Sequence, residues 1–162
     1  MRKLIVLYIL IIIFLTSCAN QRNINQFYNK YQGTENTTSF KAPMFLSSLV
    51  FGNSEEYELF RKKIKSVRVL TMRELSEQRN QMVQSDIKQA LIKDGFENWF
   101  NINQDGRVIN VSAQNRGNSL KNLVVSMQGA DNLIFINAKT NLTEAELTRF
   151  ITKVMKETDD KK

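Results

Sequence analysis

The sequence contains no histidine and only one cysteine, and these two scarcities exclude several classes of function. A single cysteine cannot form an internal disulfide, so the fold must rest on its core. Without histidine the chain lacks the usual general base and the commonest metal ligand. No Gly-x-Ser-x-Gly motif and no glycine-rich phosphate-binding loop occurs among the six glycines. We therefore expect a protein that is not an enzyme and that holds no metal or cofactor.

Long apolar runs are also scarce, and the one that stands out lies at the N-terminus. Leu4 to Phe14 is uninterrupted and follows the cations Arg2 and Lys3. At about 11 residues the run is too short to span a bilayer, which takes about 20. A short apolar run behind a positive start is typical of a signal peptide. We predict that residues 1–17 are a signal peptide that is cleaved off.

The residues that follow the apolar run explain the single cysteine. Leu15, Thr16 and Ser17 precede Cys18 and resemble the lipobox of bacterial lipoproteins, in which an aliphatic and two small residues stand before a lipid-modified cysteine. Two or three acyl chains anchor a protein stably, whereas one chain is marginal. We predict that Cys18 carries lipid and that residues 18–23 are a short tether. The alternative is an uncleaved anchor or an ordinary secretory signal with an incidental cysteine.

The residues after Cys18 and the overall charge bear on location and partners. No acidic residue follows Cys18 directly, and by resemblance to Gram-negative sorting rules this favours the periplasm-facing side of the outer membrane. The formal charge is +7, which suits anionic lipid or an acidic partner. We expect no nucleic acid partner, because an exported protein rarely meets one. The densest basic cluster is Arg61, Lys62, Lys63, Lys65 and Arg68. It is a candidate contact for an anionic surface, or alternatively a solvated helix end.

The size of the chain predicts one domain behind the tether. Of 162 residues, 17 would be removed, which leaves 145, and that number buries roughly two-thirds of its unfolded surface. Hydrophobic residues make up 42% and charged residues 24%, as in globular proteins. We expect a single domain over residues 24–158 and a frayed tail over 159–162.

Apolar periodicity predicts helices and strands along this domain. Ile24, Phe27, Tyr28 and Tyr31 share one face of a short helix that ends at Gly33. Further helices are predicted over residues 54–64 and 72–94 and after Thr143, and Pro43 is a candidate start for another. Strands are predicted over 37–41, 66–71, 96–103, 107–114, 119–128 and 132–138.

Three of these predictions depend on particular residues. Asp105-Gly106 predicts a tight hairpin turn between two strands. Thr143 and Glu146 form a capping-box pattern at the start of the last helix. In the helix over 72–94 the predicted buried stripe comprises Leu75, Met82, Val83, Ile87, Ala90 and Leu91, and in the helix over 54–64 it comprises Tyr57, Phe60 and Ile64. The order of elements predicts an α+β fold, an antiparallel sheet with a four-stranded C-terminal meander and helices packed on one face.

Several of these features together resemble a family of small Gram-negative lipoproteins classed as domain of unknown function 4252. They are the lipobox, the aromatic helix with Phe27, Tyr28 and Tyr31, the stretch 65–70, the helix end Lys93-Asp94-Gly95-Phe96 and the Asp105-Gly106 turn. The resemblance covers nearly all of the predicted mature chain. It implies no established activity, and it assigns no functional residue.

Two functions of different kinds fit the sequence. The preferred hypothesis is a membrane-anchored binding or regulatory module whose sheet face or edge meets an envelope protein. The alternative is a carrier that holds a small apolar ligand between helices and sheet. An exposed apolar patch would favour the first, and a lined pocket of at least about 300 Å³ the second. A third and remoter hypothesis, an enzyme that works with carboxylates alone, would require those carboxylates to converge in one cleft.

Overall fold

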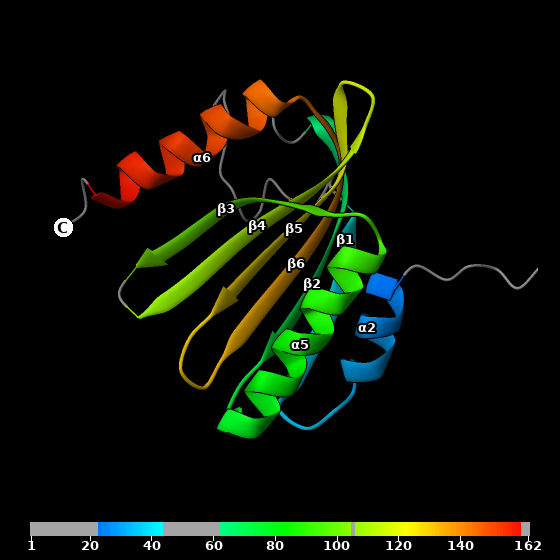
Figure 1. Ribbon diagram of the computed structural model, residues 1–162, viewed down its shortest axis with the longest axis vertical. Coiled ribbons are helices and arrows are strands. Elements are labelled where there is room, and N and C mark those ends of the chain that lie inside the picture. The colour runs from blue at the N-terminus through cyan, green and yellow to red at the C-terminus, as the bar shows by residue number, and fades with distance from the viewer. Residues whose placement is uncertain (1–22, 44–61, 105, 160–162) are drawn as a thin grey trace, which may run out of the picture.

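The computed structural model describes residues 23–43, 62–104 and 106–159 (Figure 1). The predicted signal peptide, the lipobox with Cys18, the region 44–51, the helix over 54–61 and Arg61 lie outside the described residues. The described elements are α2 Asn23–Tyr31, β1 Thr37–Pro43, β2 Ile64–Met72, α5 Glu77–Lys93, β3 Glu97–Gln104, β4 Arg107–Arg116, β5 Ser119–Gln128, β6 Leu133–Leu142 and α6 Glu144–Asp159.

The six strands form one antiparallel sheet in the order β1-β2-β6-β5-β4-β3. The four strands from β3 to β6 are consecutive neighbours, so the predicted meander is confirmed as part of a larger sheet. β6 also pairs with β2, with Ile136 opposite Val69, and β1 adds the outer strand on that side. The prediction of an α+β fold with an antiparallel sheet is therefore confirmed.

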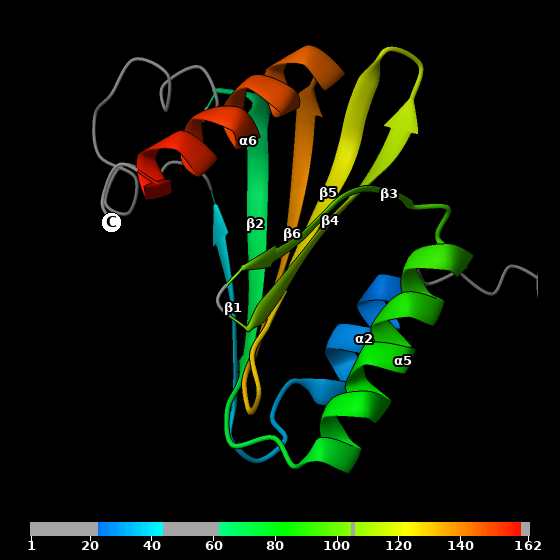
Figure 2. The same cartoon turned by 60° about the vertical axis from the view of Figure 1, so that its left-hand side comes forward.

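The sheet carries helices on both faces, so the prediction that helices pack on one face is wrong (Figure 2). Leu70 and Phe135 belong to the core under α2 and α5, whereas Ala138 and Leu123 belong to a second core with Leu147 of α6. Successive residues of a strand point to opposite faces, and the central strands are apolar at both sets of positions. A second layer is needed to cover the second apolar face, and α6 supplies part of it.

The first core is centred on the aromatic side chains of α2. Tyr28 is fully buried, and its hydroxyl donates to the carbonyl oxygen of Arg68 at 2.8 Å. The Phe27 ring lies 4.9 Å from the ring of Phe135, measured between centroids. The predicted buried face of this helix is confirmed, because Ile24, Phe27, Tyr28 and Tyr31 are all buried.

The long helix starts later than the sequence predicts. The predicted helix begins at residue 72, but Met72 pairs with Thr37 and with Leu133 as the last residue of β2. The helix begins after Ser76, whose hydroxyl accepts from the backbone N–H of Arg79 at 3.3 Å. Met72 and Leu75 have helical spacing, but both are buried outside the helix. Met82, predicted to be buried, is 49% exposed.

Smaller differences occur near the predicted helix boundaries. Ile64, predicted to close the helix over 54–64, begins β2 opposite Thr140. Pro43 ends β1, which is an edge strand, where the missing N–H is tolerated. β6 runs to Leu142 rather than 138, because Thr140 is buried and donates to the Leu120 carbonyl at 2.5 Å.

The capping box is confirmed: the Thr143 N–H donates to the Glu146 carboxylate at 2.8 Å, and the Glu146 N–H donates to the Thr143 hydroxyl at 3.4 Å.

Candidate functional site

The start of α2 is fixed to the end of α5 by one carboxylate. Asp94 accepts hydrogen bonds from the backbone N–H groups of Asn23 and Ile24 at 3.0 and 2.9 Å, and from the Asn23 side chain at 2.9 Å. These bonds satisfy donors that the first turn of a helix otherwise leaves unpaired, and the negative charge suits that helix end. The segment that leads from Cys18 therefore joins the domain at a defined corner.

This corner is connected to the sheet by side-chain amides. Gln114 of β4 donates to the carbonyl oxygen of Asp94 at 2.6 Å, and Asn122 of β5 donates to the Gln114 side chain at 2.5 Å. Asn122 is only 6% exposed, so it holds its position firmly. Both amides also line a hollow on the sheet beside the corner.

That hollow, which we call the basic groove, has a volume of about 330 Å³. Its lining comprises Lys65, Gln114, Asn115, Arg116, Lys121, Asn122, Lys139 and Thr140, contributed by β2, β4, β5 and β6. Four of these side chains are cationic and none is a carboxylate. A concave surface with charges of one sign concentrates potential, so the groove is suited to an anion.

The members of the predicted basic cluster that the structure describes do not all line one surface. Lys63 forms an ion pair of 2.5 Å with Glu146 of α6, and this hydrogen bond, followed by one from the Thr143 backbone, holds the pKa of Glu146 below its usual value. Arg68 lies over the Tyr28 ring at 3.9 Å and donates to Gln32. Lys62 is exposed two residues before the start of β2. Of the described members, Lys65 alone lines the basic groove.

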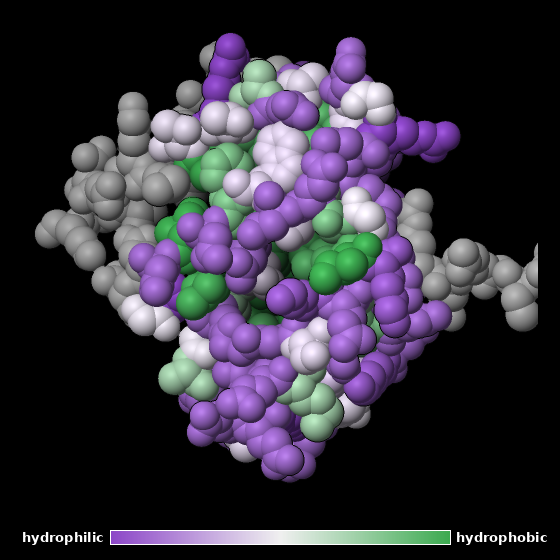
Figure 3. All heavy atoms as spheres, in the orientation of Figure 1, coloured by the Kyte–Doolittle hydropathy of each residue, from purple (hydrophilic) through white to green (hydrophobic). Residues whose placement is uncertain are grey.

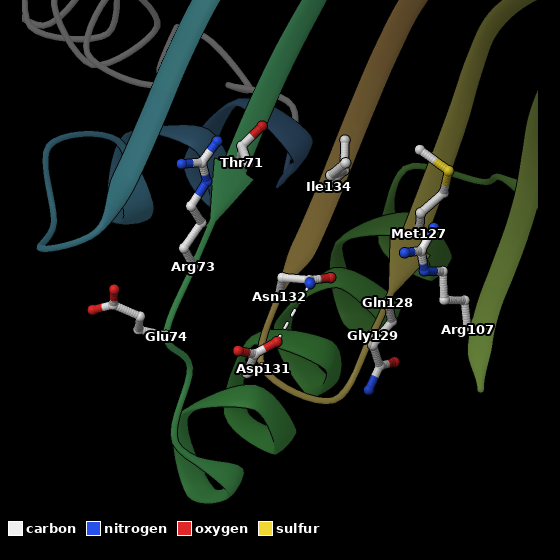
Figure 4. A pocket seen from close by; sticks show the side chains of 10 residues that line it. All are labelled: Thr71, Arg73, Glu74, Arg107, Met127, Gln128, Gly129, Asp131, Asn132 and Ile134. Atoms are coloured by element: carbon white, nitrogen blue, oxygen red, sulfur yellow. Dashed lines mark hydrogen bonds between the residues drawn. The ribbon is translucent and has the colours of Figure 1, made fainter. Parts of the chain in front are cut away.

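A second hollow, the arginine groove, lies at the other end of β2 (Figure 4). It has a volume of about 440 Å³. Arg73 and Arg107 stand on either side of Ile134 and Met127, whose side chains lie between them. The remaining lining residues are Thr71, Glu74, Gln128, Gly129, Asp131 and Asn132.

The arginine groove continues across the edge of the sheet. A neighbouring hollow of about 560 Å³ shares Thr71, Arg73 and Glu74 with it and extends to Phe40 of β1. Phe40 is 55% exposed, an unusual position for a phenylalanine ring. The surface over α5 is mainly hydrophilic (Figure 3), although Ile92 and Met82 are exposed on that helix. What sets the arginine groove apart is that its apolar side chains are flanked by two guanidinium groups.

The carboxylates of α5 have separate structural partners. Asp86 accepts from Lys30 at 2.5 Å and from the Tyr31 hydroxyl at 2.6 Å. Burial raises the pKa of Asp86, but these two hydrogen bonds outweigh it and hold the pKa below its usual value. Asp94 caps α2, and Glu77 is exposed and accepts from Gln81. Within the described ranges no group of three or more His, Cys, Asp or Glu side chains is placed to hold a metal ion.

The fold and these surfaces define an α+β protein with a six-stranded antiparallel sheet and two separate grooves. The sequence model of the family described as a domain of unknown function, DUF4252, matches residues 31–150, and the chain belongs to this family. No curated protein and no solved structure matches the chain. Among the described residues, no helix has the length and apolar character needed to cross a membrane.

Proposed function

We propose that this protein is an envelope lipoprotein, anchored through Cys18, that acts by binding another envelope protein rather than by catalysis. Its proposed location is the periplasm-facing side of the outer membrane. The anchoring rests on the apolar run and the lipobox residues Leu15, Thr16 and Ser17. Asp94 fixes the start of α2 to the end of α5, so a tether from Cys18 would join the domain at a defined point.

The observation that carries the binding proposal is the arginine groove. Ile134 and Met127 offer an apolar floor, and Arg73 and Arg107 flank it. A guanidinium group has a planar fork of donors that matches a carboxylate. The occupant we propose is an extended segment of a partner protein that presents an acidic side chain next to apolar ones. The exposed Phe40 beside the groove enlarges the apolar surface for it.

Separate structural roles of the carboxylates support binding over catalysis. A carboxylate enzyme needs two groups whose environments drive their pKa values apart within one cleft. Here each of three carboxylates has a different partner. Asp86 pairs with Lys30, Asp94 accepts from Asn23, and Glu146 pairs with Lys63. Lowered pKa values at Asp86 and Glu146 are the ordinary result of these ion pairs.

Site-specific photo-crosslinking in cells tests the proposal. A photoreactive amino acid at Met127 should capture a defined partner protein, and the same residue placed at the exposed Lys88 of α5 should not. The double variant Arg73→Glu/Arg107→Glu should abolish capture of that protein. The control Lys41→Glu/Lys88→Glu, with the same charge change elsewhere, should retain it. Purified partner and domain should then bind with an affinity that shows the same pattern. Equal capture from Met127 and Lys88, or equal loss in both variants, would refute the proposal.

The second candidate, a carrier of a small apolar ligand, would use the same groove. Its volume of about 440 Å³ lies within the range of small-ligand sites. Its lining includes Arg73, Glu74, Arg107 and Asp131, however, so a carried apolar molecule would lie next to charged side chains. Co-purification of a lipid or other small apolar molecule that Met127→Arg displaces, without any protein partner, would favour the carrier.

A further inference from the structure

The cationic side chains of the basic groove have no role in the proposed binding of a partner protein. Lys65, Arg116 and Lys139 are exposed on three different strands, and Lys121 completes the set. The side-chain amide of Asn115 lies beside them; it carries two N–H bonds, one of which donates to the Glu97 carboxylate at 3.5 Å. Several cations and a neutral donor around one hollow match a phosphate group, whose oxygens accept several hydrogen bonds.

The position of the groove indicates where such phosphates would come from. Gln114 lines the groove and donates to Asp94, whose carboxylate holds the backbone of Asn23 and Ile24. Only residues 19–22 separate Cys18 from Asn23, the first residue of α2. The five residue steps from Cys18 to Asn23 span at most about 18 Å when fully extended. A lipid on Cys18 therefore keeps this corner, and the groove beside it, close to the lipid headgroups.

We propose that the basic groove binds the phosphate groups of anionic lipids in the membrane that holds Cys18. This inference rests on the proposed function for the lipid at Cys18. To the anchoring it adds a defined orientation of the domain on the membrane. Lys65 lies near the start of β2, and Arg73 follows its last residue. The eight residues from one to the other correspond to about 26 Å of extended strand. With the basic groove on the membrane, the arginine groove at the other end of β2 is held away from it, where a partner can reach it.

The single cysteine allows the geometry to be tested without biosynthetic lipidation. The chain from Cys18 onward retains both cores, because the first core residue in the sequence is Ile24. Its thiol can be coupled to a maleimide lipid in vesicles of phosphatidylcholine alone or of phosphatidylcholine with phosphatidylglycerol. Amine acylation followed by mass spectrometry then reports the accessibility of each lysine. We expect Lys65, Lys121 and Lys139 to react about fivefold or more slowly on the anionic vesicles, and Lys88 to react equally on both.

Two variants of equal net charge make the test specific, with Lys121 as the reporter in both. Lys65→Gln/Arg116→Gln/Lys139→Gln should lose the protection of Lys121. Lys41→Gln/Lys88→Gln/Arg149→Gln removes three exposed cations elsewhere and should keep it. Raising the ionic strength should reverse the protection in the unmodified chain, because headgroup attraction is screened by salt.

Four outcomes would overturn the inference. They are equal lysine reactivity on neutral and anionic vesicles, equal loss of protection in the two variants, protection that resists salt, and protection by inorganic phosphate alone at the same phosphate concentration. The last result would identify a site for free phosphate instead of a membrane contact. Because the maleimide lipid replaces the natural one, these outcomes are independent of whether cells acylate Cys18, and failure of the anchoring proposal is recognised separately.

Discussion

At the residue scale, three carboxylates join elements that are distant in the sequence. Asp94 joins α5 to α2, Asp86 joins the same two helices further along, and Glu146 joins α6 to Lys63. These pairs cannot be predicted from sequence patterns, because a carboxylate near a helix end is common and its partner lies many residues away. Asp94 stands out in the sequence only as the residue before a helix-ending glycine.

Replacing Asp94 by asparagine should destabilise the domain. The amide keeps one acceptor for the α2 backbone, but it loses the second acceptor and the negative charge at the helix start. We expect a cost of about 1–2 kcal/mol in the free energy of unfolding, measured by urea denaturation. Asp131→Asn is the matched control, since the Asp131 side chain is exposed and accepts a hydrogen bond from its neighbour Asn132 at 3.3 Å. A similar cost for both substitutions would contradict the capping role of Asp94.

Asp86 should make stability depend on acidic pH. Its folded pKa lies below its usual value because Lys30 and Tyr31 donate to it, although burial acts the other way. The stabilisation is therefore fully present above the unfolded pKa, near 4, and is lost as the pH falls through the lower folded value. Asp86→Asn should lower the urea midpoint at pH 6, and the difference from the unmodified chain should shrink toward pH 2 to 3. A difference that is constant over this range, with Glu77→Gln as the control, would contradict the ion-pair account.

At the scale of elements, turns and caps are predictable from the sequence and the packing of layers is not. The predicted bounds of β5, 119–128, are confirmed to the residue, because turn residues stand at both ends. The start of α5 is missed because Met72 and Leu75 mimic helical spacing, whereas pairing with β1 and β6 keeps Met72 in a strand. The face that α6 covers is not predicted, because strands that are apolar on both faces do not indicate which helix packs on which face of the sheet.

The capping box of α6 gives an element-scale prediction. Thr143→Ala removes the hydroxyl that accepts from the Glu146 N–H, so the free energy of unfolding should fall by about 1 kcal/mol. Thr148→Ala makes the same change in the body of α6, where alanine is the better helix former. Thermal or urea midpoints of the two variants compare them directly. If Thr148→Ala destabilises as much as Thr143→Ala, the cap is not the cause.

At the scale of the whole molecule, the candidate sites depend on strands far apart in the chain. The basic groove collects Lys65, Arg116, Lys121 and Lys139 from four strands, and the arginine groove collects Arg73 and Arg107 from the ends of two. The sequence indicates Lys65 as part of a local basic cluster, but sheet pairing replaces its expected neighbours with others. The features that the sequence does indicate, the predicted lipobox and the helix after it, concern the proposed anchoring.

The central claim is that a lipid on Cys18 holds this domain at the membrane, and its most direct test is mass spectrometry of the natural N-terminus. Trypsin cuts after Arg22, so a mature lipoprotein extracted from membranes should yield a five-residue peptide, residues 18–22, with a diacylglyceryl group on the cysteine and with or without an N-terminal acyl chain. Cys18→Ala should abolish this peptide and leave the uncleaved precursor. A chain that begins at Met1 or at any residue other than Cys18, with a free thiol at Cys18, would contradict the account.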